Sequence, residues 1–203
     1  TVFVPETKNG SVDVTFIFDA TGLHGKEIVV FEDLYRENVL LATHADINDE
    51  GQTIKVKNPE IGTTASFEGE KEIDPLDKVT LTDNVSYKDL TPGKEYRVTG
   101  VLMDKSNGKE LLINGEKVTA EATFVATEAS GSVDVTFIFD ATGLHGKEIV
   151  VFEDLYRENV LLATHADIND EGQTVKIKNP EIGTKATADG KKEITADKIT
   201  ITD

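Results

Sequence analysis

Residues 132–140 read SVDVTFIFD, and this stretch decides the class of fold. Val133, Val135, Phe137 and Phe139 alternate with other residues, so an extended strand would place all four apolar side chains on one face. A half-buried strand of an antiparallel sheet has this pattern, because one face packs on a core and the other meets water. We therefore expect an all-β domain with a strand here.

Outward from this stretch, further short strand-like runs are separated by turn residues such as Pro92-Gly93 and Asn107-Gly108. Only residues 140–144 indicate a helical turn. About seven short strands without a long helix predict an immunoglobulin-like antiparallel β-sandwich, with a barrel as the second possibility. The expected strands besides the first are 78–87, 95–103, 119–125, 148–152, 160–166 and 174–178.

The chain also repeats itself. Residues 131–174 repeat residues 10–53 without a change, 121 positions later. Residues 57–83 return more loosely as 178–203, whereas 84–121 occur once. The period is that of a whole domain rather than of a solenoid turn.

This repeat predicts tandem immunoglobulin-like sandwiches in a window cut from a longer protein. Residues 1–57 would be the C-terminal part of one repeat, 58–178 a complete repeat, and 179–203 the N-terminal part of the next. Near-identity between tandem domains is typical of a stalk in which length is the function. A recent duplication without mechanical meaning is the alternative.

Composition excludes several classes of function. The 203 residues carry a formal net charge of −17 and contain no cysteine. Such a surface repels nucleic acids and anionic membranes, and the absence of cysteine excludes disulfides, thiolate zinc sites and cysteine nucleophiles. No apolar run approaches the ~18 residues that a membrane-spanning helix needs. We expect neither a nucleic-acid nor a membrane partner, and no cofactor or metal.

Five polar residues occupy positions that strand alternation directs toward the core. Each lies in register with apolar neighbours of its own run. In residues 161–165, for example, the apolar Leu161 and Ala163 alternate in register with His165. The five residues are Thr63, Asp83, Glu153, His165 and Gln173.

Burying these groups separately would cost ~1–3 kcal/mol for each missing hydrogen bond, and more for an unpaired charge. The free-energy cost of burial is lowest if the five side chains lie together. The purely structural explanation is that the five side chains form a buried network with all hydrogen bonds made. Alternatively, they lie at strand ends and are half exposed to water. As a cluster, however, the five have the composition of an acyl-transfer site.

In such a site, a threonine hydroxyl becomes a nucleophile when a neighbouring base takes its proton, and His165 or a carboxylate is suitable. Asp83 and Glu153, if adjacent and poorly solvated, should share a proton that can stabilise an oxyanion or reach the leaving group. The electrophile at hand is the Gln173 carboxamide. Attack by Thr63 would expel ammonia and leave a side-chain ester, in a single self-reaction.

The chain resembles the VaFE repeat, the ester-bonded immunoglobulin-like domain of Gram-positive surface adhesins. Residues 150–153 (VVFE) are similar to the motif that names the family, apart from the second position. Residues 165–173 (HADINDEGQ) resemble its His-to-Gln segment. Residues 81–87 (LTDNVSY) and 96–104 (YRVTGVLMD) resemble its front part.

The resemblance implies a secreted, wall-anchored adhesin stalk in which a Thr–Gln ester joins the first and last strands of each repeat. The linked pair would be Thr63 and Gln173, assisted by Asp83, Glu153 and His165. Strand parity favours Thr63 over Thr64 and Ser66 as the nucleophile. Neighbouring repeats would be the partners, and any host ligand would bind elsewhere on the full-length protein. The equivalent positions in the partial copies are Glu32, His44, Gln52, Thr184 and Asp203.

Two other functions are compatible with this part of the sequence. Residues 167–172 (DINDEG) resemble the start of a calcium loop, which would make the chain a plain or calcium-dependent binding module. An EF-hand would need a carboxylate where Lys178 stands, so a polar turn is the simpler reading. A hydrolase would use Thr63 on an outside substrate, but parity directs that hydroxyl inward.

Overall fold

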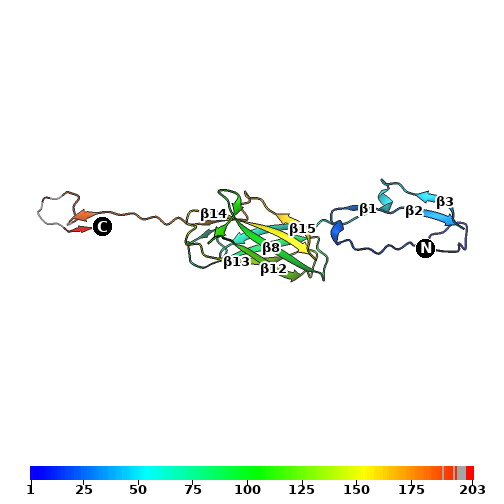
Figure 1. Cartoon of the computed structure of the whole chain (residues 1–203), viewed down its shortest axis with the longest axis horizontal. Helices are drawn as coiled ribbons and strands as arrows, with labels where there is room; N and C mark the ends of the chain where they lie inside the picture. Colours follow the sequence, from blue (N-terminus) through cyan, green and yellow to red (C-terminus); the bar gives the residue numbers. More distant parts are fainter. Residues whose placement is uncertain (189, 194, 196–199) are drawn as a thin grey trace.

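The structure is a computed structural model that describes residues 1–188, 190–193, 195 and 200–203. Figure 1 shows three parts in a row: an N-terminal part made of small strand pairs, a central two-sheet sandwich, and a short C-terminal hairpin. The chain enters the sandwich from one end and leaves it at the other. The sandwich contains every strand from β5 to β16.

The smaller sheet of the sandwich holds three antiparallel strands in the order β13-β7-β5. In β7, alternate residues are buried, as the apolar alternation predicts. Asp83 occupies one of these inward positions and pairs with Val135 of β13. The strands are β5 (Glu60–Ser66), β7 (Val79–Lys88) and β13 (Gly131–Phe139).

The larger sheet has seven strands, with the order β12-β8-β14-β16-β6 and with β15 and β9 paired at its sides. All neighbours are antiparallel except β16 and β6, which are parallel. A separate small hairpin joins β10 (Leu112–Ile113) to β11 (Glu116–Lys117). The strands of the larger sheet are β6 (Glu72–Ile73), β8 (Glu95–Asp104), β9 (Lys109–Glu110), β12 (Thr119–Val125), β14 (Glu148–Arg157), β15 (Val160–His165) and β16 (Thr174–Ile177).

The core lies between these two sheets, so the barrel alternative is wrong. Phe137 is fully buried and packs over Gly100, where an added Cβ would lie 2.5 Å from the Phe137 ring. A side chain at Gly100 would therefore force the sheets apart. Val79, Leu81 and Ile149 are also fully buried there.

Two local expectations were wrong. Alternation placed Leu161 inward, but it is 45% exposed while Leu162 is buried. The cause is a bulge: Leu155 pairs with Ala163 and Tyr156 with Leu161, so Leu162 is an extra residue that turns inward. In addition, residues 140–144 form turns rather than a helical segment, although their copy contains the 3-10 helix η1 (Thr21–Leu23).

The terminal parts form strand pairs rather than sandwiches in the described residues. Among those residues, no helix is long and apolar enough to cross a bilayer. The N-terminal part contains β1 (Glu27–Val29), β2 (Glu32–Arg36), β3 (Val39–His44), the 3-10 helix η2 (Glu50–Gln52) and β4 (Thr53–Lys55). The C-terminal part contains β17 (Thr187–Ala188) and β18 (Ile201–Thr202).

Candidate functional site

The site forms where β5 of the smaller sheet meets the segment that leads into β16 of the larger sheet. The Ala65 N–H donates a hydrogen bond to the Gly172 carbonyl at 3.0 Å, which ties the two segments together. Gln173 follows Gly172 directly, and Thr63 lies on the same face of β5 as Ala65. Thr64 points the other way and is exposed.

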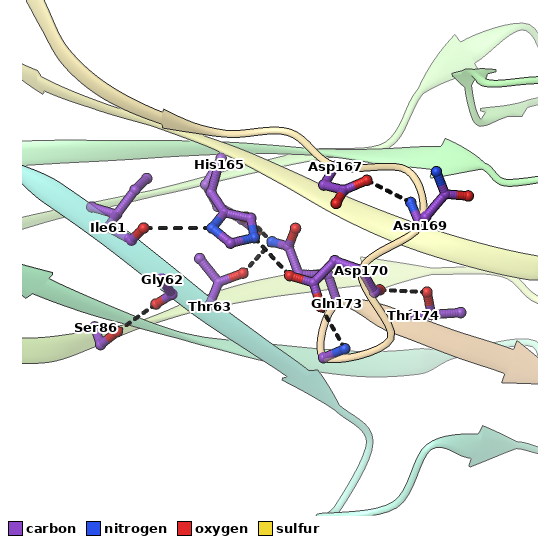
Figure 2. A network of polar contacts seen from close by, with 12 residues as sticks. Ile61, Gly62, Thr63, Ser86, His165, Asp167, Asn169, Asp170, Gln173 and Thr174 are labelled. Atoms are coloured by element: carbon purple, nitrogen blue, oxygen red, sulfur yellow. Dashed lines mark hydrogen bonds and ion pairs between the residues drawn. The ribbon is translucent and has the colours of Figure 1, made fainter.

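Gln173 is the centre of the cluster. Its side chain is fully buried. Its Nε2 donates to the hydroxyl oxygen of Thr63 and to Oε2 of Glu153, the latter at 2.5 Å. Figure 2 shows the Thr63 hydroxyl directed at the Gln173 carboxamide. The structure thus brings a hydroxyl, a carboxamide and a carboxyl together, although Thr63 and Gln173 are 110 residues apart.

Asp83 and Glu153 form a buried carboxyl pair beside this carboxamide. Burial, followed by the adjacent Asp83 carboxyl, raises the pKa of Glu153 to about 10, against the lowering by hydrogen bonds from Gln173 and Thr63. Burial also raises the pKa of Asp83, although interactions with Glu153 and then Lys71 lower it. Like charges so close cannot both persist without solvent, so the pair keeps a proton at neutral pH, and the raised pKa of Glu153 places it on that residue.

The buried oxygens of Asp83 and Glu153 that lack other partners support a proton between the two carboxyls. Among the described residues, neither carboxylate oxygen of Asp83 has a hydrogen-bond partner, nor does Oε1 of Glu153. The Thr64 N–H lies near enough to lower the pKa of Asp83 without meeting the geometry of a full hydrogen bond. A carboxyl proton shared between the two acids is the simplest way to satisfy these buried oxygens.

His165 lies at the edge of the cluster, held by two acceptors (Figure 2). Its Nε2 is 2.8 Å from Oδ2 of Asp170, and its Nδ1 is 3.4 Å from the Ile61 carbonyl. The hydrogen bond to His165 holds the pKa of Asp170 below its usual range. Sequence reasoning missed Asp170 because it was considered only as part of a calcium loop. The spacing of five between the two residues also occurs in the N-terminal copy, where His44 and Asp49 are 2.7 Å apart.

Lys71 is the second residue that sequence reasoning missed. Its Nζ donates to the carbonyls of Ala65 and Gly172, each at 2.5 Å, so it joins β5 to the segment that carries Gln173. The one available signal was the recurrence of this lysine as Lys192 in the looser repeat.

The Asp167 and Asp170 carboxylates both accept hydrogen bonds from backbone N–H groups of their own loop. Besides His165, Asp170 accepts the Gly172 N–H at 2.7 Å, and Asp167 accepts the Asn169 N–H at 2.9 Å. Within the part of the chain that the structure describes, no three His, Asp or Glu side chains are grouped as metal ligands.

The equivalent residues of the partial copies do not form a second cluster. Glu32 pairs with His44 across a hairpin, as Glu153 pairs with His165 in the sandwich. Gln52, however, lies in the N-terminal part, whereas the segment with Thr184 lies beyond the sandwich (Figure 1). Thr184 and Asp203 are both exposed.

A sequence model of the family described as the T-Q ester bond containing domain matches residues 1–56 and 59–177. The chain belongs to the T-Q ester bond domain family. Comparison with curated protein sequences gives no significant match.

Among solved structures, this T-Q ester bond domain protein is similar to a bacterial adhesin from Mobiluncus mulieris that contains intramolecular disulfide, isopeptide and ester bond cross-links. Two crystal forms of the adhesin, P21 and P1, match equally well, with a TM-score of 0.54 and 18% identity. The match covers 61% of this chain and 58% of the adhesin chain. The likeness shows a shared fold.

Proposed function

We propose that residues 58–178 form a complete structural repeat that locks itself with an ester between Thr63 and Gln173. The observation that carries this proposal is the buried contact of the Gln173 amide with the Thr63 hydroxyl and the Glu153 carboxyl. The family whose model matches the chain is defined by such a bond. The reaction occurs once per repeat, so the chain is not an enzyme acting on an outside substrate.

The Asp83–Glu153 pair can handle both protons of the reaction. Thr63 Oγ attacks Cδ of Gln173 and gives its proton to the ionised carboxylate of the pair. As the C–N bond breaks, the proton held by Glu153, which contacts Nε2, passes to the leaving nitrogen. One ester and one ammonia form, and the pair again holds one proton.

His165 then acts as an orienting group rather than as the base. Both of its ring nitrogens face oxygen acceptors, namely Asp170 and the Ile61 carbonyl, so neither is directed at the Thr63 hydroxyl. His165 also contributes to lowering the pKa of nearby Asp83.

The ester would make the repeat suitable for a load-bearing stalk on the surface of a Gram-positive cell wall. It would join β5, the first strand of the sandwich, to the start of β16, the last strand of the larger sheet. Tension on the chain would then pass through a covalent bond instead of through the hydrogen bonds between strands. The adhesin with a similar fold carries cross-links of this kind.

Peptide mapping tests the linkage directly. A protease digest of the folded chain should contain one branched peptide that joins the Thr63 and Gln173 segments, and hydroxylamine should split it because it cleaves esters. Thr63→Val removes only the hydroxyl and should abolish the branched peptide, whereas the matched exposed change Thr64→Val should leave it. A parent digest that contains only linear peptides would refute the proposal.

A further inference from the structure

Lys71 spans the two segments that must meet for the ester to form. It follows the turn after β5, and its Nζ donates to the Ala65 and Gly172 carbonyls at 2.5 Å each. Its own backbone carbonyl accepts the Lys176 N–H of β16 at 2.8 Å. Side chain and backbone therefore hold β5 against the segment on both sides of Gln173.

This clamp fixes the distance between the nucleophile and the electrophile. Gly172 directly precedes Gln173, and Ala65 is the next inward residue after Thr63 on β5. The Gly172 carbonyl accepts both the Ala65 N–H and the Lys71 ammonium. In enzyme sites, a displacement of ~1 Å costs about 100-fold in rate, so a second tether at this point matters for the reaction.

The charge of Lys71 also faces the acid pair. Burial lowers the pKa of Lys71 below its usual range, and two carboxylates oppose this lowering: Asp83 on β7 and Asp170 in the loop before Gln173. In turn, Lys71 lowers the pKa of Asp83. The other titratable groups around Asp83 are Glu153 on β14 and His165 on β15.

In the C-terminal copy of the repeat, the equivalent lysine side chain points at the equivalent carbonyl. Lys192, the counterpart of Lys71, donates to the carbonyl of Ala186, the counterpart of Ala65, at 2.5 Å. In the described residues, the strands of this hairpin pair with each other. The lysine-to-carbonyl contact thus forms here without a glutamine segment paired to the hairpin.

We propose that Lys71 is a positioning residue for ester formation, which clamps the Gln173 segment to β5 through the Ala65 and Gly172 carbonyls. This inference rests on the proposed Thr63–Gln173 reaction. It explains why an ammonium group is placed beside the site without contacting Thr63, Gln173 or Glu153 among the recorded hydrogen bonds.

The test measures the rate of ammonia loss by intact mass after refolding from denaturant, at a series of pH values. Lys71→Met removes the tether and the charge, Lys71→Gln keeps one donor without the charge, and Lys71→Arg keeps both. Lys94→Met is the matched control, because Lys94 is an exposed lysine just before β8 and lies outside the clamp.

We expect Lys71→Met to form the ester at least 10-fold more slowly than the parent. The acidic limb of its pH–rate profile should move to higher pH, because Asp83 without its cationic neighbour ionises later. Lys71→Gln should show the same shift with a smaller loss of rate, and Lys71→Arg should restore the parent profile. The control should match the parent throughout.

A parent-like rate and profile in Lys71→Met would overturn the proposal. So would a uniform slowing at all pH values that Lys71→Arg fails to rescue, since that would mark a purely structural role. If Lys71→Met does not fold, Lys71→Gln decides by the same criteria. Failure of the parent itself to lose ammonia would instead refute the ester reaction, which keeps the two claims distinguishable.

Discussion

At the scale of single residues, the site depends on the proton that the buried Asp83 and Glu153 carboxyls keep beside the Gln173 carboxamide. Strand alternation directs Thr63, Asp83, Glu153, His165 and Gln173 to this cluster. How the two carboxyls share the proton depends on the surrounding charges, which a sequence does not display. Asp170 and Lys71 escaped notice because they reach the site from loops, where alternation gives no direction.

Glu153→Gln should abolish ester formation while the fold survives. The amide keeps the shape of the carboxyl and can still contact Asp83, but it cannot deliver a proton to the leaving nitrogen. We expect the rate of ammonia loss to fall by at least 100-fold with an unchanged circular dichroism spectrum. Ester formation at the parent rate would remove Glu153 from the mechanism.

The raised pKa of Glu153 also predicts a pH dependence of stability before the ester forms. The pKa is 4.5 ordinarily and about 10 in the fold, so the fold binds more protons than the unfolded chain between these values. This contribution to stability is complete below pH 4.5 and is lost as the pH rises toward 10.

Measuring this pH dependence requires proteins that cannot form the ester. Two variants meet this condition: Thr63→Val and the double variant Thr63→Val/Glu153→Gln. Urea unfolding should show the single variant losing stability relative to the double variant between pH 5 and pH 9. A constant difference between the two over this range would contradict the assignment of the proton to Glu153.

At the scale of elements, the identical segments show what a sequence alone leaves open. Residues 131–139 form β13 and bury Phe137 completely. Residues 10–18 have the same sequence, yet they form no strand and leave Phe16 56% exposed. The difference is the partner: β13 pairs with β7, for which the N-terminal part has no counterpart. Alternation thus identifies a possible strand, and its neighbour decides whether it forms.

The ester should stabilise the sandwich by holding β5 and β16 together in the unfolded chain. It closes a loop of 110 residues, for which the chain-entropy treatment of cross-links gives ~4–5 kcal/mol. Thr63→Val should lower the free energy of unfolding by about this amount, measured in guanidinium. Thr64→Val, on the exposed face of the same strand, should change it by less than ~0.5 kcal/mol.

At the scale of the whole molecule, the structure shows contacts between the parts that the sequence did not predict. The N-terminal part meets the sandwich through an ion pair at 2.5 Å between Lys57 and Asp89. The Asn58 side chain lies against Gly25 at this junction, and Asn179 lies against Gly146 at the next. The same local packing therefore recurs 121 positions later. The Lys57–Asp89 ion pair could not be foreseen, because Asp89 belongs to the segment that occurs only once.

Force applied to the ends of the chain should reveal the cross-link mechanically. Without the ester, the segment between Thr63 and Gln173 would extend by about 38 nm on unfolding, at ~3.5 Å for each residue. Single-molecule stretching should show this step in Thr63→Val and not in the parent. Parent molecules that released the full length at the same force as the variant would contradict the stalk proposal.

We expect this chain to carry one ester, between Thr63 and Gln173. Intact mass measured on the folded protein tests it most directly. The mass should be lower than that of the sequence by one ammonia, not two, because in the described residues Thr184, the counterpart of Thr63, lies beyond the sandwich from Gln52. It should return to the sequence mass in Thr63→Val. A folded parent with the full mass of the sequence would contradict the account.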